Sequence, residues 1–280
     1  MTVNAPLRHE IFAANRASGR LAFSVVAAAG GSRRGRVHEA GSLRVRFPNG
    51  ERGRDNPLEA VMVNTAAGMA GGDRFSIDIT VGAGARLTAT TAAAEKIYRS
   101  LGPETEIGVK LKVGAGASLA WLPQETILFD RARLRRTIEV DVAKDAALIL
   151  AEAVVFGRSA MGETVVSGYC FDRWRVRING ALAFAETLCL DGAIAERLGR
   201  RASADGAIAL ASVLKIPGDE AGIAAVRAIK RDCAGEVGVS AWNGLALARL
   251  VAPDGATLRR DLIGVLAALG ATPLPRLWLN

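Results

Sequence analysis

A short segment that recurs along the chain constrains the fold more than any other feature of the sequence. Val81-Gly-Ala-Gly-Ala-Arg-Leu87 returns as Val113-Gly-Ala-Gly-Ala-Ser-Leu119 and, less closely, as Val142-Ala-Lys-Asp-Ala-Ala-Leu148. Two looser echoes end at Leu182 and Ile208. Repeats of about 30 residues that contain strands are typical of stacked β architectures. We therefore expect a mainly β fold, built as stacked hairpins or as irregular β-solenoid-like layers.

Alternation of apolar and polar residues supports the same prediction. Leu43-Arg-Val-Arg-Phe47, Phe75-Ser-Ile-Asp-Ile-Thr-Val81 and Trp174-Arg-Val-Arg-Ile178 all have a period of two. This period indicates strands that are buried on one side and solvated on the other.

Helical periodicity is confined to the C-terminal part. Asp219 is expected to cap one helix that ends near Gly235, and a second helix is expected from about Thr257 to Gly270. The sequence has no linker or low-complexity stretch, so we expect one domain over residues 1–280, with two α-helices near its C-terminus.

Composition excludes several classes of protein. The 280 residues are 50% hydrophobic, which is incompatible with a disordered chain. The longest uncharged run, residues 262–275, contains two prolines and is shorter than the roughly 20 apolar residues of a membrane span. The first ten residues lack the apolar core of a secretory signal, and the three cysteines are odd in number, as is usual in a reducing compartment. We expect a cytoplasmic protein that has no membrane partner.

Basic charge is concentrated at the start of the chain. Residues 1–54 contain ten arginines, among them Arg33, Arg34 and Arg36, against three acidic residues. Such a field attracts an acidic partner, although a solvated strand face is the simpler interpretation. The segment has no Lys, Trp or Tyr, which disfavours nucleic acid.

Several carboxylates stand among apolar or small residues. A buried carboxylate is costly unless it is paired or lines a wet cavity. Pairing with Lys96, Arg99 or Arg158 is the structural interpretation, and a polar channel or metal-handling path is the functional one. Carboxylates without histidine or thiolate hold a transition metal weakly, which suits transfer better than storage. These acids are Asp73, Glu95, Glu125, Asp130, Glu152 and Glu163, of which Glu125 and Glu152 are expected to stack on adjacent rungs.

These acids lie in longer blocks of sequence. The blocks are Gly68-Met-Ala-Gly-Gly-Asp73, Ala94-Glu-Lys-Ile-Tyr-Arg99, Trp121-Leu-Pro-Gln-Glu-Thr-Ile-Leu-Phe-Asp130, Glu152-Ala-Val-Val-Phe-Gly-Arg158 and Met161-Gly-Glu163. Together they resemble the urease accessory protein family UreD, also called UreH. One departure is Ala67, where the family usually has a second glycine before the loop.

The resemblance implies a non-enzymatic scaffold of urease maturation. Members bind apo-urease and the accessory protein UreF, and through UreF they recruit the GTPase UreG, which carries nickel. The assembly supports nickel insertion into urease, so we expect no tightly bound cofactor but transient Ni²⁺. The family fold is mainly β with two helices, and an internal nickel path has been proposed for it. On this chain the candidate members of such a path are Glu95, Glu125, Asp130, Glu152 and Glu163.

Partner contacts are predicted at three places. The arginines at positions 33, 34 and 36 are expected to meet acidic apo-urease, and the C-terminal helices with Trp242 and Trp278 to contribute to the UreF-facing surface. Asp73, Lys96 and Tyr98 are assigned partner or structural roles. Two other classes remain as alternatives, a β-solenoid enzyme acting on acidic polysaccharide and a nucleic-acid-binding module.

Overall fold

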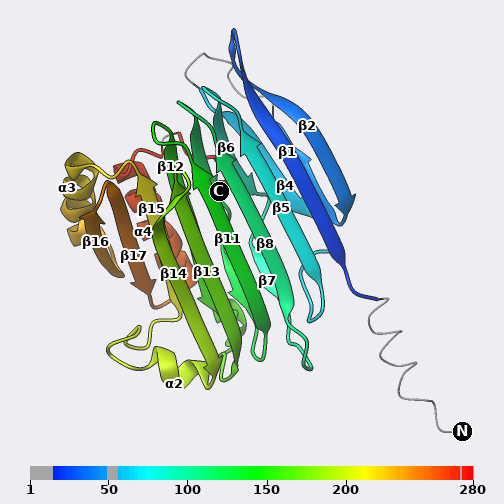
Figure 1. Cartoon of the computed structure of the whole chain (residues 1–280). Helices are drawn as coiled ribbons and strands as arrows, with labels where there is room; N and C mark the ends of the chain where they lie inside the picture. Colours follow the sequence, from blue (N-terminus) through cyan, green and yellow to red (C-terminus); the bar gives the residue numbers. More distant parts are fainter. Residues whose placement is uncertain (1–14, 49–55, 272, 280) are drawn as a thin grey trace, which may run out of the picture.

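The computed structural model describes residues 15–48, 56–271 and 273–279, and they form two β-sheets and a layer of helices (Figure 1). One sheet faces the viewer in Figure 1 and is called the front sheet; the other is called the back sheet. The front sheet has the spatial order β14 (Ala181–Gly192), β13 (Gly168–Ile178), β11 (Arg133–Val142), β8 (Thr105–Val113), β5 (Arg74–Val81), β1 (Ser18–Ala28), β2 (Gly31–Gly41). The back sheet has the order β16 (Glu236–Trp242), β17 (Leu245–Ala252), β15 (Ala209–Ile216), β12 (Ala147–Phe156), β9 (Ser118–Leu122), β6 (Arg86–Thr91), β4 (Leu58–Asn64), β3 (Leu43–Arg46).

The chain winds between the two sheets as a β-solenoid. From β4 to β13 the long strands alternate between back and front, and each pairs in parallel with its equivalent in the next coil. The expectation of a mainly β, solenoid-like fold is thereby confirmed. The Gly-Ala-Gly turns of the repeat link the front sheet to the back sheet, so the strands that flank each turn lie in different sheets and do not pair as hairpins.

Register explains why the repeat is visible in the sequence. Leu87, Leu119 and Leu148 pair in a row across the back sheet, and each is at most 2% exposed. The two looser echoes do not join this row. Leu182 lies in the front sheet and is 56% exposed, and Ile208 precedes β15, which runs antiparallel to β12. The repeat therefore comprises three units.

A second row of stacked residues forms where the back sheet bends. After β6 the chain leaves the sheet briefly and re-enters it as β7 (Glu95–Ile97), and after β9 it does the same and re-enters as β10 (Thr126–Leu128). β7 pairs with β10, and β10 pairs with the end of β12. Met69, Ile97, Leu128 and Phe156 are aligned along this row and are almost fully buried. The bend places Glu95 and Glu125 at the same corner of the molecule.

Both predicted C-terminal helices are present. In α3 (Glu220–Ile229) the Asp219 carboxylate accepts a hydrogen bond from the Gly222 N–H, and in α4 (Gly255–Ala268) Asp254 accepts one from the Thr257 N–H at 2.8 Å. Such side chains satisfy amide groups that the helix leaves free at its N-terminus. The short α2 (Ile194–Leu198) was not expected, because five residues are too few for a periodic signal.

Three short 3₁₀ segments complete the described elements. They are η1 (Ser159–Met161), η2 (Lys230–Asp232) and η3 (Arg276–Trp278). Over the described ranges, no helix is long and apolar enough to cross a membrane.

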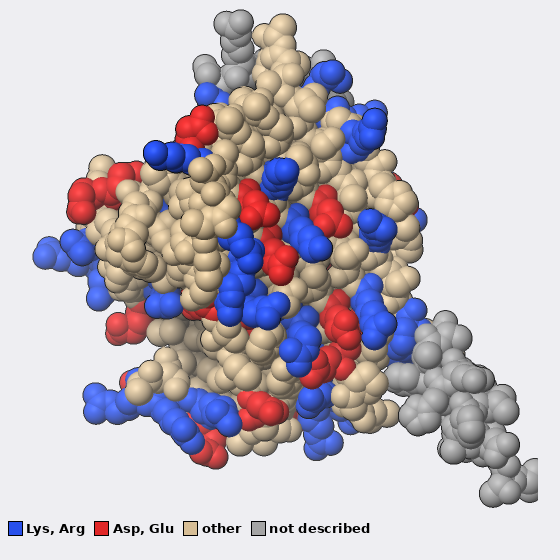
Figure 2. All heavy atoms as spheres, in the orientation of Figure 1, with Lys and Arg blue, Asp and Glu red and all other residues tan. Residues whose placement is uncertain are grey.

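Two apolar cores hold the layers together. The larger lies between the sheets, and the smaller lies between the back sheet and α3 and α4. The outer face of the front sheet is left to solvent, and Figure 2 shows basic and acidic side chains intermingled across it.

Candidate functional site

A charged cluster lies inside the larger core. Arg136 of β11 alternates with Leu134 and Ile138, so its side chain points from the front sheet into the interior. Its guanidinium donates to the carboxylate of Glu152 on β12 of the back sheet, and to Asp172 on the neighbouring strand β13. All three side chains are at most 6% exposed. The cluster therefore bridges the two sheets.

Polar neighbours complete this cluster only in part. The Trp121 Nε1–H donates to Glu152 at 2.8 Å, and the Arg136 guanidinium also donates to the Thr126 hydroxyl at 3.1 Å. Arg136 Nε and Asp172 Oδ1 are buried and have no hydrogen-bond partner. A buried polar atom without a partner is costly, so these two mark a place where the interior can take a further polar group.

Burial controls the electrostatics of the cluster. Loss of hydration raises the pKa of Glu152 to about 7, against the opposing effect of Arg136. Burial also disfavours the charge on Arg136, but the adjacent Asp172 and Glu152 carboxylates outweigh it and the pKa of Arg136 is raised. When both carboxylates are ionised, two negative charges share one positive charge.

Glu95 connects the cluster to the surface. It pairs in register with Thr126 across the parallel strands β7 and β10, so the two side chains are neighbours on one face. Its carboxylate accepts a hydrogen bond from the Asn64 amide at 3.1 Å, and burial raises its pKa. No cationic side chain of the described residues forms an ion pair with it. We call the set Asn64, Glu95, Thr126, Arg136, Glu152 and Asp172 the polar row.

The side chain of Glu125 faces away from this row. It forms an ion pair at 3.0 Å with Arg259 of α4, which covers the outer face of the back sheet. The expectation that Glu125 and Glu152 stack on adjacent rungs is wrong. The chain leaves the sheet between β9 and β10, so Glu125 faces the helix layer while Glu152 faces the front sheet.

Asp130 and Glu163 close a surface loop. Asp130 accepts hydrogen bonds from the N–H groups of Val166 and Ser167 at 2.9 and 3.2 Å. Glu163 accepts one from the Asp130 N–H and pairs with Arg158 at 2.8 Å, which holds the pKa of Glu163 below its usual value. These two carboxylates lie beside each other, and their hydrogen bonds are used within the loop.

The loop before β5 is organised by Asp73 and Tyr98. Asp73 accepts hydrogen bonds from the N–H groups of Ala17 and Ala70 at 2.8 and 2.7 Å, and it is 4% exposed. The Tyr98 hydroxyl donates to the Ala67 carbonyl at 2.9 Å. Ala67 has a φ of 59°, so alanine here takes the left-handed conformation that the family's usual glycine adopts without strain.

The remaining predicted residues fall into exposed and buried groups. Lys96 is exposed, and the arginines at 33, 34 and 36 are exposed on the edge strand β2. Residues 1–14 and 49–54 of the basic segment lie outside the described residues. Trp242 is 38% exposed in β16, whereas Trp278 is 1% exposed and donates to the Leu122 carbonyl at 3.0 Å. Arg259 lies over the ring of Trp278.

Sequence reasoning missed Arg136, Asp172, Thr126 and Trp121. For two of these residues, Arg136 and Asp172, the sequence contains a signal. Arg136 occupies an inward position of its strand, between Leu134 and Ile138, and Asp172 occupies one between Cys170 and Trp174. A charged residue at the apolar phase of an alternating strand indicates a buried partner of opposite charge.

The fold and the polar row define a two-sheet β-solenoid with a charged interior. A family model described as UreD urease accessory protein matches residues 16–279. The chain belongs to the UreD urease accessory protein family.

Individual relatives agree with this assignment. The chain is 57% identical over 270 residues to urease accessory protein UreD of Rhodopseudomonas palustris strain BisA53, covering 96% of this chain and 93% of that protein. It is 56% identical over 270 residues to the protein of the same name from Bradyrhizobium diazoefficiens, covering 96% of each chain. It is 51% identical to UreD 1 of Bradyrhizobium sp. strain ORS 278, covering 97% of this chain and 96% of that protein.

Proposed function

We propose that this protein is a non-catalytic maturation factor of urease. In this role it is a scaffold that binds apo-urease and UreF, recruits the GTPase UreG through UreF, and supports nickel insertion. Membership of the UreD family and the names of the relatives support the urease role. We place it in the cytoplasm, where thiols such as its three free cysteines stay reduced.

The observation that carries the nickel part of the proposal is the polar row. Among the five predicted carboxylates, Glu95 is the one for which the described residues supply no cationic partner. Ni²⁺ as cargo would take the place of that partner. A single carboxylate binds a transition metal weakly, so the ion would be passed on readily.

Movement of Ni²⁺ along the polar row beyond Thr126 depends on the position of the Arg136 side chain. Its single positive charge is shared by Glu152 and Asp172, so a divalent cation would have to displace it from at least one of them. Asp172 Oδ1, which lacks a partner in the described structure, is an oxygen that the cation could reach without breaking a hydrogen bond. Transfer through the row is therefore coupled to movement of one side chain.

The test uses Glu95→Gln and Glu152→Gln in a strain that expresses the urease genes and the other accessory genes. Glu196→Gln removes an exposed carboxylate of α2 and is the matched control. We expect Glu95→Gln to lower nickel per urease severalfold, while the melting temperature and the capture of UreF are unchanged. Normal nickel loading in the double variant that still assembles would refute the transfer role, and loss of soluble protein in Glu95→Gln would make Glu95 structural.

A further inference from the structure

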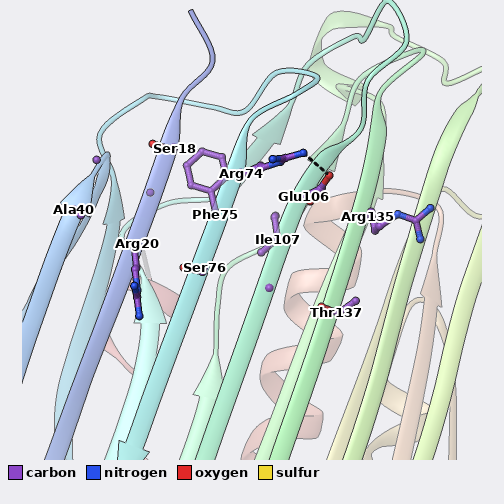
Figure 3. Close-up of a pocket in the computed structure, with 13 residues that line it drawn as sticks. Ser18, Arg20, Ala40, Arg74, Phe75, Ser76, Glu106, Ile107, Arg135 and Thr137 are labelled. Atoms are coloured by element: carbon purple, nitrogen blue, oxygen red, sulfur yellow. Dashed lines mark ion pairs between the residues drawn. The ribbon is translucent and has the colours of Figure 1, made fainter. Parts of the chain in front are cut away.

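The outer face of the front sheet carries a groove of about 600 Å³ (Figure 3). It crosses the strands from β2 through β1, β5 and β8 to β11. It is lined mostly by small residues, together with Phe75, Ile107, three arginines and the carboxylate of Glu106. The polar row lies on the inner side of this sheet, so the groove is a separate feature of the molecule.

Register creates the groove. Arg20, Ser76, Gly108, Thr137 and Arg173 pair in a single line across five adjacent strands. On β5, β8 and β11 charged residues occupy the neighbouring lines, whereas β1 has Ser18 and Ala22 there. They are Arg74, Glu106 and Arg135 on one side, and Asp78, Lys110 and Glu139 on the other. On the three middle strands the small residues Ser76, Gly108 and Thr137 lie between two lines of long side chains, which leaves a trough across β5, β8 and β11.

Gly108 at the centre of the trough has no internal reason to be glycine. A Cβ at this position would meet nothing closer than the Phe75 carbonyl at 4.0 Å, and its φ is not positive. Glycine weakens a strand interior, where it often marks a place at which another backbone or a ligand approaches closely. Gly19, which also lines the groove, differs because a Cβ there would lie 2.6 Å from the Leu43 side chain.

The two ends of the line carry unsatisfied positive charge. Arg20 is exposed and forms no ion pair with the described residues, and Arg173 has a buried Nε without a hydrogen-bond partner. The arginines of the flanking line, in contrast, already have carboxylate partners. Arg74 pairs with Glu106 at 3.6 Å, and Arg135 pairs with Glu104 at 2.6 Å.

Arg173 lies on β13, one strand beyond the residues that line the groove. We propose that the groove and its continuation to Arg173 bind an extended acidic peptide segment of a partner protein. Four strand spacings of about 4.8 Å separate Arg20 from Arg173, or about 19 Å, which an extended chain spans in about six residues. The segment passes with its backbone over Gly108 and places carboxylates at the two terminal arginines. The groove has no exposed aromatic face on which bases could stack, since Phe75 is 4% exposed, so it suits peptide better than nucleic acid.

The inference goes beyond the proposed function, because it concerns a different face and requires no nickel. Failure of nickel transfer through the polar row leaves it unaffected, and its own failure leaves the scaffold role intact.

The test is an array of nonapeptides with two acidic residues at varied spacing, each printed beside its Asn/Gln counterpart and probed with the full-length protein. The best pair is then measured in solution by fluorescence anisotropy. We expect binding to be strongest near a six-residue spacing, and to weaken by about tenfold in Arg20→Glu and in Gly108→Val. Gly238→Val makes the same change at an open position of β16 and is the matched control.

Stability separates a binding role of Gly108 from a structural one. Valine favours a strand, so Gly108→Val should keep or raise the melting temperature while it weakens peptide binding. The proposal is overturned if no acidic peptide binds more tightly than its amide counterpart, or if Gly108→Val binds as well as the parent. It is also overturned if oligothymidylate displaces the peptide and binds more tightly than it does.

Discussion

Arg136 of the front sheet and Glu152 of the back sheet form an ion pair across the solenoid interior, with each side chain at most 5% exposed. Asp172 shares the same guanidinium, so one cation pairs with carboxylates from both sheets. The stability of the fold therefore depends on the charge of each of these three side chains.

Removal of the shared cation should therefore be severe. Arg136→Met leaves two buried carboxylates unpaired, and we expect a loss of roughly 3–5 kcal/mol in the free energy of unfolding. Arg135→Met, one residue along, removes a surface ion pair and should cost less than about 1 kcal/mol. Urea denaturation of both variants measures the difference, and equal losses would contradict the bridging role of Arg136.

The free energy of unfolding should depend on pH through the protonation of Glu152. Its pKa is about 7 in the folded protein against an ordinary value of 4.5, so between these pH values the folded state holds a proton that the unfolded chain has released. The contribution of Glu152 to the free energy of unfolding therefore decreases as the pH rises from 4.5 to 7. Glu152→Gln lacks this dependence. Unfolding curves of parent and variant at pH 5, 6, 7 and 8 should diverge with pH, and parallel behaviour would rule out the shift.

The exposed arginines of β2 provide a test of the apo-urease contact. Reversal of Arg33, Arg34 and Arg36 to Glu should slow association at low salt without unfolding the protein, since exposed charges act mainly on the association rate. Surface plasmon resonance against apo-urease at several salt concentrations gives the rates. The same triple reversal of Arg197, Arg200 and Arg201, in and after α2, is the control. An unchanged rate, with no salt dependence in the parent, would remove the proposed contact.

The UreF-facing surface is best tested at Trp242. Deletion of the chain from Asp261 onward would remove part of α4 and Trp278, which are buried in the smaller core, so it would unfold the protein rather than probe a surface. Trp242→Ala removes a large, partly exposed ring and should weaken capture by UreF about tenfold if the ring is a central contact. Leu182→Ala, also exposed, is the comparison. Full capture by the Trp242 variant would place the UreF surface elsewhere.

The sequence predicted those parts of the fold that depend on local pattern. Alternation identified strands such as β5 and β13, the three-unit repeat identified the stacking, and Asp219 marked the start of α3. It did not reveal that the turns join different sheets, because a Gly-Ala-Gly turn has the same local form whether its strands pair or separate.

The candidate site was only partly accessible to the same reasoning. Glu95 and Glu152 could be selected because their neighbours are apolar, but their partners come from other coils and depend on register. Glu125 looked equivalent to Glu152, yet a short break in the sheet turns it toward Arg259. The groove over Gly108 arises from five strands at once, so no single segment carries a signal for it.

The antiparallel strands at the ends of the solenoid have a consequence for how copies of the chain meet. A stack of parallel coils would end in edge strands whose backbone N–H and C=O groups have no partner. A second copy could pair with these groups and extend the stack, as happens in fibrils. In the front sheet β2 and β14 pair antiparallel with the outermost parallel strands, and in the back sheet β3 and β15 do the same. The reversed strand direction and the arginines of β2 make the edge a poor template for another coil. The terminal strands of this solenoid therefore disfavour end-to-end stacking of its copies.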